Sequence, residues 1–130
     1  MATWDDVRAV VAALPDTDEP SEHAWKVHGR SLAWERPLRR ADHEALGDAA
    51  PTGDILGVRT AGLDAKDALL ASSPQVFFTT PHFDGYPAVL VRLAEIGSDE
   101  LTEVVVEAWL HQAPKRVSAA WLTEHPDALP

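Results

Sequence analysis

The segment from His82 to Tyr86 carries the side chains whose types and spacing are best suited to chemistry. His82 and Asp84 stand two residues apart between two expected strands, so they can point the same way and share a proton or a metal ion. Zinc sites need three or four ligands, and no other His, Asp or Glu stands at a diagnostic spacing from this pair. The alternative is that both side chains hydrogen-bond the backbone of a tight turn in which Gly85 takes the unusual dihedral angles.

An acidic ridge on an expected C-terminal helix is a second candidate for cation binding. Some of its members stand four residues apart, so their carboxylates stack on one helix face and could gather hard cations through oxygen ligands. The alternative is a helix face that simply meets solvent. The ridge consists of Asp99, Glu100, Glu103 and Glu107.

A basic segment that contains tryptophan is the third candidate. Residues 25–41 carry five Lys and Arg against one Glu, a local charge of +4, and residues 113–117 carry +2. Cations mixed with Trp25 and Trp34 suit phosphate contacts and base stacking. Strand alternation places Trp25 and Lys26 on opposite faces, so tryptophans in the core are the alternative. The candidate nucleic-acid-binding residues are Lys26, Arg30, Arg36, Arg39, Arg40, Lys115 and Arg116.

Several classes of enzyme are excluded or disfavoured by the residues present. The sequence has no cysteine, which excludes thiolate metal sites, iron–sulfur clusters and cysteine nucleophiles. Its seven glycines match neither the G-x-G-x-x-G nor the P-loop spacing, and no serine lies in a G-x-S-x-G or S-x-x-K motif. We therefore expect a protein that is not an enzyme and that needs no cofactor.

Length and composition indicate a single small domain over residues 1–130. The chain is 45% hydrophobic and has 11 Lys and Arg against 21 Asp and Glu, a net charge of −10. No apolar run approaches the roughly 20 residues that span a bilayer, and the acidic N-terminal residues are unlike the basic start of a signal peptide. We expect a cytoplasmic protein with no membrane partner.

Helices are predicted from apolar spacing and from end signals. Thr3 followed by Asp6 is typical of a helix N-terminus, and an apolar stripe with the spacing i, i+3, i+4, i+7 follows it. Ser98 caps a longer stripe whose first turn is acidic, and Pro114 suits the first turn of another helix. The expected helices are 4–14, 38–46, 64–71, one that begins at Ser98 and one that Pro114 opens.

Strands are predicted from alternation between apolar and polar residues. Residues 23–28 and 31–36 alternate on either side of Gly29, which is typical of a β-hairpin. Further strands are expected over 54–60, 75–79 and 87–93. The order of elements favours an α+β fold in which an antiparallel sheet of about five strands is covered by helices on one face.

Residues 79–93 (TTPHFDGYPAVLVRL) and 113–116 (APKR) resemble the MmcQ/YjbR family of small bacterial proteins. The opening helix and the tryptophan-containing hairpin fit the resemblance, which covers nearly the whole chain. It implies a CyaY-like α+β fold related to frataxin, with a double-wing motif and a DNA-binding role. No reaction is established for the family, so the matching motif positions carry no assigned roles: His82, Asp84, Gly85, Tyr86, Pro114, Lys115 and Arg116.

Two classes of binding function follow from these observations. The first is a weak, salt-sensitive DNA-binding module that uses the basic residues, although a net charge of −10 repels phosphate backbones. The second is a small-ligand or metal-binding module that uses the His82 and Asp84 loop or the acidic helix. A protein-interaction domain that presents exposed tryptophans is a further alternative.

Overall fold

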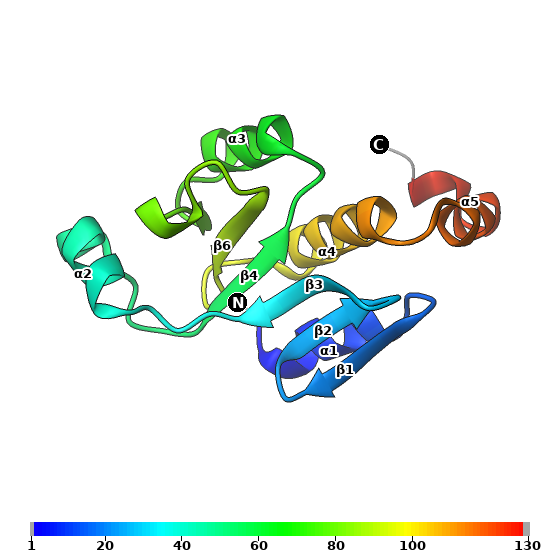
Figure 1. The fold of residues 1–130 in the computed structure, drawn as a ribbon, viewed down its shortest axis with the longest axis horizontal. Coiled ribbons are helices and arrows are strands. Elements are labelled where there is room, and N and C mark those ends of the chain that lie inside the picture. Colours follow the sequence, from blue (N-terminus) through cyan, green and yellow to red (C-terminus); the bar gives the residue numbers. More distant parts are fainter. Residues whose placement is uncertain (1, 129–130) are drawn as a thin grey trace.

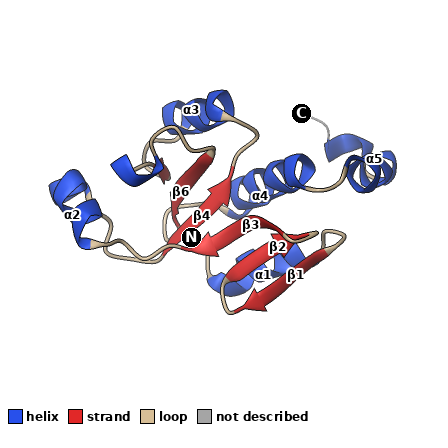
Figure 2. Ribbon diagram, viewed as in Figure 1, coloured by secondary structure: helices blue, strands red, loops and turns tan. Residues whose placement is uncertain are grey.

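The computed structural model describes residues 2–128, which form a six-stranded antiparallel sheet with helices packed against it (Figures 1 and 2). The α+β class predicted from the sequence is confirmed. The strands are β1 (Thr17–Ser21), β2 (Ala24–Val27), β3 (Arg30–Glu35), β4 (Ile55–Arg59), β5 (Phe77–Phe78) and β6 (Ala88–Arg92), in the sheet order β1-β2-β3-β4-β6-β5. The helices are α1 (Trp4–Ala12), α2 (Arg40–Leu46), α3 (Leu63–Ser72), α4 (Ser98–Gln112) and α5 (Lys115–Glu124), with short 3-10 turns η1 (Gly47–Ala49), η2 (Pro81–Phe83) and η3 (Pro126–Ala128).

One face of the sheet packs against α1 and α4 and forms the larger core. Trp25 and Val27 of β2 point into this core, as do alternate residues of β4 and β6. From α4, Trp109 is fully buried and its Nε1 donates a hydrogen bond to the carbonyl oxygen of Pro15 at 2.9 Å. The apolar stripe that predicted α4 therefore faces the sheet, and the capping box between Thr3 and Asp6 fixes the start of α1.

A β-bulge allows β3 to contribute to both faces of the sheet. Trp25 pairs with Ala33 and Lys26 pairs with Ser31, so Leu32 is the extra residue between these two pairs. Leu32 and Ala33 consequently both lie in the larger core, whereas Trp34 packs on the opposite face.

The opposite face of β4 and β6 carries a second, smaller core. Ile55 and Leu90 point into it, together with Phe78 and Phe83. Leu46 of α2 packs against this cluster, so α2 departs from the single helical layer expected from the sequence. The reason is that β4 and β6 are central strands with apolar residues on both faces. A strand that is buried on both faces shows no alternation, so its sequence does not indicate that helices cover both sides of the sheet.

Gly57 in β4 lies directly beneath the indole ring of Trp34. A Cβ atom added at Gly57 would lie 2.6 Å from Trp34 Cε2 and 2.8 Å from Trp34 Nε1. Real Cβ atoms essentially never make such contacts, so the ring rests on the bare backbone of β4.

Gly57→Ala is expected to lower the free energy of unfolding by about 1–3 kcal/mol, because the added methyl group overpacks the second core. The substitution also displaces the Trp34 ring. Urea denaturation measures the first effect, and the chemical shift of the Trp34 indole proton measures the second. Gly53→Ala is the matched control, since its Cβ meets nothing within 4 Å. A Gly57→Ala protein with unchanged stability and an unchanged indole resonance would contradict the packing described here.

The sequence did not predict β1, so the sheet has one strand more than expected. Residues 17–21 read TDEPS, which contains no apolar residue and includes Pro20. Proline is compatible with a strand only at a sheet edge or at a bulge, and β1 is an edge strand with an irregular register between Asp18 and Ser21. The other edge, β5, is shorter than the expected strand over 75–79.

An ion pair fastens β1 to α1. Arg8 Nε donates to Glu19 Oε1 at 2.7 Å and Arg8 Nη2 donates to Glu19 Oε2 at 3.0 Å, a two-pronged geometry. The Arg8 guanidinium lowers the pKa of Glu19 to about 2.

The pKa of Glu19 in the folded protein lies below the ordinary pKa of a glutamate. The ionised Glu19 carboxylate therefore contributes fully to stability when the pH is above that ordinary pKa. We expect this contribution to be lost as the pH falls toward about 2. Glu19→Gln should therefore make thermal stability less dependent on pH below the ordinary glutamate pKa. The control is Asp18→Asn, which removes the charge of the exposed residue next to Glu19. If both variants melt with the wild-type pH dependence, the Arg8–Glu19 pair does not contribute in solution.

Candidate functional site

The basic residues singled out in the sequence fall into two groups at opposite ends of β3. At the start of the strand, Lys26 pairs with Ser31, and Gln112 Nε2 donates to the carbonyl oxygen of Ser31 at 2.9 Å. This hydrogen bond joins the end of α4 to the start of β3, and α5 follows directly with Pro114 at its N-cap. We use the name α5-end patch for the four basic residues of the two segments that this hydrogen bond joins: Lys26, Arg30, Lys115 and Arg116.

The other three basic residues lie beyond the far end of β3, around the start of α2. Figure 1 shows α2 and α5 at opposite ends of the molecule. Arg36 is buried and paired with a carboxylate, so it is not available to a phosphate. Arg40 is exposed and lies 3.5 Å from Glu44, and Arg39 is exposed. The seven candidate nucleic-acid-binding residues therefore lie in two separate groups, one at each end of β3.

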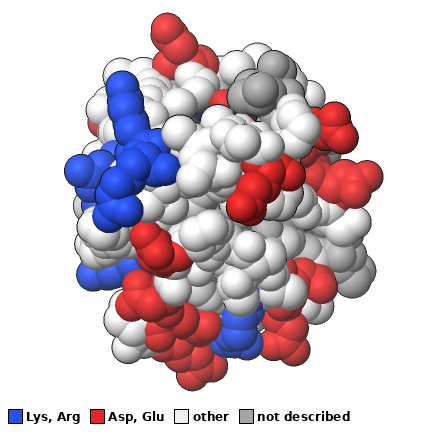
Figure 3. Space-filling model, turned by 90° about the vertical axis from the view of Figure 1, so that its right-hand side faces the viewer, with Lys and Arg blue, Asp and Glu red and all other residues white. Residues whose placement is uncertain are grey.

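The surface charge is mixed even around the α5-end patch. Figure 3 looks onto the side of the molecule that carries α5, and Lys and Arg side chains gather at one edge of this face. Asp and Glu side chains are spread over the rest of it. A long nucleic acid would therefore meet repulsion outside the patch.

The two hairpin tryptophans are not an exposed stacking platform. Trp25 is 2% exposed and belongs to the larger core, which confirms the alternative based on strand alternation. Trp34 is half-buried over Gly57. Among residues 2–128, the large exposed hydrophobic side chains are Leu63 and Tyr86, so no tryptophan there meets the expectation of an exposed interaction surface.

The His82 to Tyr86 loop begins with η2 and turns at Gly85, whose φ of 75° lies in the left-handed region that favours glycine. His82 packs edge-on against Phe83, with ring centroids 5.0 Å apart, and His82 and Asp84 are both exposed. Within the described part of the chain, no three His, Asp or Glu side chains converge as a metal site would require. This holds for the loop and for the acidic ridge, in which Glu100 accepts a hydrogen bond from Ser73 at 2.8 Å.

Lys66, which the sequence analysis did not single out, anchors this loop from α3. Its Nζ donates to the carbonyl oxygens of Phe83 at 2.6 Å and of Tyr86 at 3.0 Å. Burial lowers the pKa of Lys66, and the nearby Asp84 carboxylate opposes this effect. The signal was present in the sequence, because Lys66 shares a helix face with Leu69 and Leu70 and is thus a lysine within an apolar stripe.

A pocket of about 440 Å³ lies between the end of β3 and this loop. It brings together one end of the basic hairpin and the histidine motif, which are distant in the sequence. We call it the Trp34–Tyr86 pocket, and it is lined by Trp34, Glu35, Arg36, Pro37, Arg39, His82, Phe83 and Tyr86.

Arg36 joins the three segments that build this pocket. Its Nη2 lies 3.1 Å from Asp42 Oδ2 in the first turn of α2, and its Nη1 donates to the carbonyl oxygen of Pro37. Its guanidinium carbon also lies 5.3 Å from the centre of the Phe83 ring. The side chains of both ion-pair partners are less than one tenth exposed.

Asp42 is held as a carboxylate in spite of its burial. Burial by itself would raise the pKa of Asp42, but the backbone amide of Arg39, which donates to Oδ2 at 2.8 Å, and the Arg36 guanidinium outweigh this effect and lower it. The Arg36–Asp42 pair is therefore a charged pair inside the protein, and it fixes the backbone at Arg39.

Tyr86 forms the outer wall of the pocket and is itself supported. It is 42% exposed, and the Arg59 guanidinium lies 5.0 Å from its ring centre. Arg59 Nη1 donates to the Tyr86 hydroxyl oxygen at 3.3 Å, and Arg59 Nε donates to the carbonyl oxygen of Pro87 at 3.2 Å. The exposed ring thus has a fixed position.

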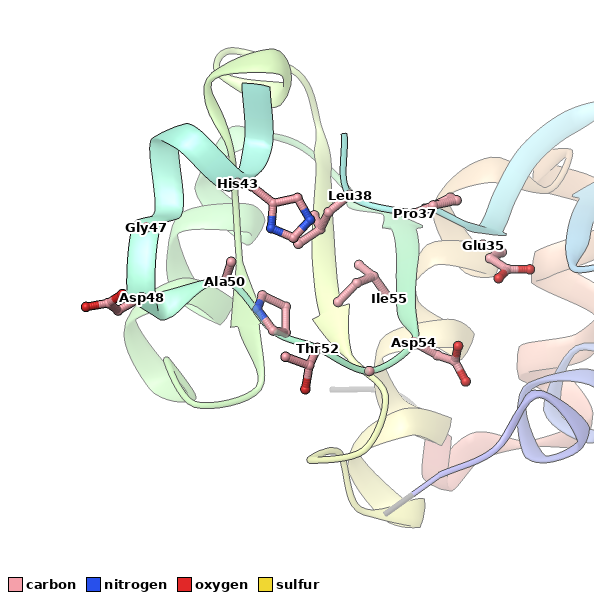
Figure 4. Close-up of a pocket in the computed structure, with 12 residues that line it drawn as sticks. Glu35, Pro37, Leu38, His43, Gly47, Asp48, Ala50, Thr52, Asp54 and Ile55 are labelled. Carbon is pink, nitrogen blue, oxygen red and sulfur yellow. The ribbon is translucent and has the colours of Figure 1, made fainter. Parts of the chain in front are cut away.

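A second hollow of about 610 Å³ lies between the Pro37–Leu38 segment, α2 and the 47–54 segment (Figure 4). His43 points into it beside Leu38, whereas Asp48 and Asp54 point away from it (Figure 4). Ligand pockets usually present several convergent polar groups. The Trp34–Tyr86 pocket meets that description better, although it is the smaller of the two.

Close relatives of this chain occur in mycobacteria. The uncharacterized protein Rv2570 of Mycobacterium tuberculosis (strain ATCC 25618 / H37Rv) is 58% identical to it over 125 residues, which cover 94% of this chain and 97% of that protein. The uncharacterized protein Mb2600 of Mycobacterium bovis (strain ATCC BAA-935 / AF2122/97) matches to the same extent. The chain belongs to the Rv2570 family. No family model and no solved structure matches it.

The relationship extends over almost the full length of both proteins. At 58% identity, we expect members of the Rv2570 family to share the sheet and the two cores described above. Within residues 2–128, no helix is long and apolar enough to cross a bilayer.

Proposed function

We propose that this protein is a cytoplasmic, non-catalytic binding module whose ligand is a small molecule held in the Trp34–Tyr86 pocket. The observation that carries the proposal is the convergence of two separate sequence features on one hollow. Arg36 and Arg39 come from the basic segment, and His82 and Tyr86 come from the histidine motif. A volume of about 440 Å³ lies within the usual range of small-molecule sites.

The construction of the pocket supports binding rather than catalysis. Its buried lining charge, Arg36, is already paired with Asp42, and Lys66, which lies outside the lining, binds two backbone carbonyls of the 81–86 loop. What remains for a ligand is a set of aromatic side chains together with Glu35, Arg39 and His82. Such a set orients a molecule without providing a nucleophile and an adjacent base.

A test of this proposal uses ring compounds of matched shape and different charge. The probes are benzoate, benzamide and benzylamine, and indole-3-acetate, indole-3-acetamide and tryptamine. We expect at least one of them to shift the backbone amide of Tyr86 and the indole proton of Trp34 in two-dimensional NMR, with a Kd of about 1 mM or tighter.

Tyr86→Ala should weaken that binding, and Leu63→Ala should not, because Leu63 is the other large exposed hydrophobic residue and lies outside the pocket. The proposal fails if no probe shifts pocket resonances at 10-fold higher concentration, or if Leu63→Ala weakens binding as much as Tyr86→Ala.

A second candidate function is weak DNA binding, which the resemblance to the MmcQ/YjbR family implies. The observation that favours it is the Gln112–Ser31 hydrogen bond, which gathers the α5-end patch from two basic segments. Binding should weaken steeply with salt. Fluorescence anisotropy with a DNA duplex at about 50 mM salt tests it: a Kd weaker than about 10⁻⁴ M would eliminate this function.

A further inference from the structure

In the part of the chain that the structure describes, Arg39 is the cation of the Trp34–Tyr86 pocket that has no carboxylate partner, and Glu35 supplies the one carboxylate among the lining residues. Arg36 is balanced by Asp42 at 3.1 Å. The carboxylate of Glu35 lies 2.8 Å from His23 Nδ1 and makes its interaction outside the pocket. Within residues 2–128, the Arg39 side chain has neither an ion pair nor a hydrogen bond, whereas its backbone amide is fixed by the hydrogen bond to Asp42. Arg39 is therefore a cation on an anchored backbone.

Three of the residues that line the pocket are Trp, Phe or Tyr: Trp34, Phe83 and Tyr86. Trp34 is held over Gly57, Phe83 is buried beneath Arg36, and Tyr86 is held by Arg59. Rings in fixed positions provide flat surfaces at little cost in side-chain entropy, and they suit a planar ligand. His82 completes the rim beside Phe83.

From these observations we infer that the pocket selects an aromatic or heteroaromatic anion, with its ring against Trp34 and Tyr86 and its carboxylate or phosphate group toward Arg39. This inference rests on the proposed function and names its ligand class. A carboxylate and a phosphate both suit a planar guanidinium, which binds either through paired hydrogen bonds.

The ring probes, which are matched in shape and differ in charge, test the inference separately from the function. Benzoate and indole-3-acetate should bind about tenfold more tightly than the corresponding amides, because a carboxylate can form an ion pair with two parallel hydrogen bonds to the Arg39 guanidinium and a neutral amide cannot. Phenyl phosphate, added as a further probe, distinguishes a phosphate preference from a carboxylate preference. Calorimetric or NMR titration gives each Kd.

Arg39→Gln should reduce the affinity for the anions about tenfold and leave the affinity for the amides unchanged. Arg40→Gln is the matched control, since Arg40 is the next residue, is exposed and lies outside the pocket lining. Arg39→Lys keeps the charge but loses the fork geometry, so it should retain part of the preference. Thermal melts of each variant establish that it is folded.

The possible outcomes are distinct. If amides and acids bind the pocket equally well, the proposed function stands and the inference about charge is overturned. The same holds if Arg40→Gln lowers anion affinity as much as Arg39→Gln, because the effect is then one of general surface charge. If no ring probe of any charge reaches the pocket, the proposed function fails and the inference fails with it.

Discussion

Replacing Arg36 by alanine is expected to lower the free energy of unfolding by about 3–5 kcal/mol, because it leaves Asp42 as a buried carboxylate without its partner. The loss includes the contact between the guanidinium and Phe83. Urea denaturation at neutral pH measures it. Arg40→Ala provides the control, and removal of its exposed pair with Glu44 should change stability by about 0.5 kcal/mol or less.

The pH dependence of this loss has a definite sign. The folded pKa of Asp42 lies below its ordinary value, so the carboxylate contributes stability at neutral pH and loses that contribution as the pH falls through the folded pKa. The difference between the wild type and Arg36→Ala should therefore shrink in acid. An Arg36→Met, Asp42→Leu double variant should recover much of the stability, since apolar residues can replace a buried ion pair. If Arg36→Ala is as stable as the wild type, the Arg36–Asp42 pair is not needed for stability.

Replacing Lys66 by methionine is expected to lower the free energy of unfolding by about 3 kcal/mol, because two hydrogen bonds from a charged group are lost. The carbonyl groups of Phe83 and Tyr86 keep only their hydrogen bonds from the backbone amides of Tyr86 and Ala88. The effect should be local as well as global. Amide hydrogen exchange should become faster in the 81–86 segment than in α4, because Lys66 is the side chain that fixes this loop to α3.

Lys115→Met is the control for the Lys66 substitution. It removes an exposed lysine at the start of α5 and should change stability by less than about 0.5 kcal/mol. Ring probes should also bind Lys66→Met more weakly than Lys115→Met, since Tyr86 forms a wall of the pocket. If exchange in 81–86 is unchanged in Lys66→Met, the loop is held by other contacts and the role assigned to Lys66 is wrong.

The elements that the sequence predicted best are those with a local physical cause. The apolar stripe of α4 and the capping pair of α1 lie within single helices, and they predicted both elements to within about two residues at their ends. The glycine turn likewise predicted the β2–β3 hairpin. Each of these signals needs only a few neighbouring residues.

The candidate site could not be predicted in the same way because its contacts are long-range. Arg36 and Arg40 look equivalent in a basic segment, yet one is buried against Asp42 and the other is exposed. The difference depends on the second core, which forms only because β6 pairs with β4 and brings the 81–86 loop beside the end of β3. Polar residues that take part in such contacts resemble surface residues when the sequence is read alone.

The two edges of the sheet determine how the molecule behaves at high concentration. An exposed edge strand offers unpaired backbone groups on which another chain can add, and such addition begins many aggregates. At one edge, β1 carries two acidic residues and Pro20, which has no N–H to donate. At the other edge, β5 has only two residues. With a net charge of −10 opposing every encounter between copies, neither edge is a good template for intermolecular strand pairing. The strand that was hardest to predict therefore protects the fold from aggregation.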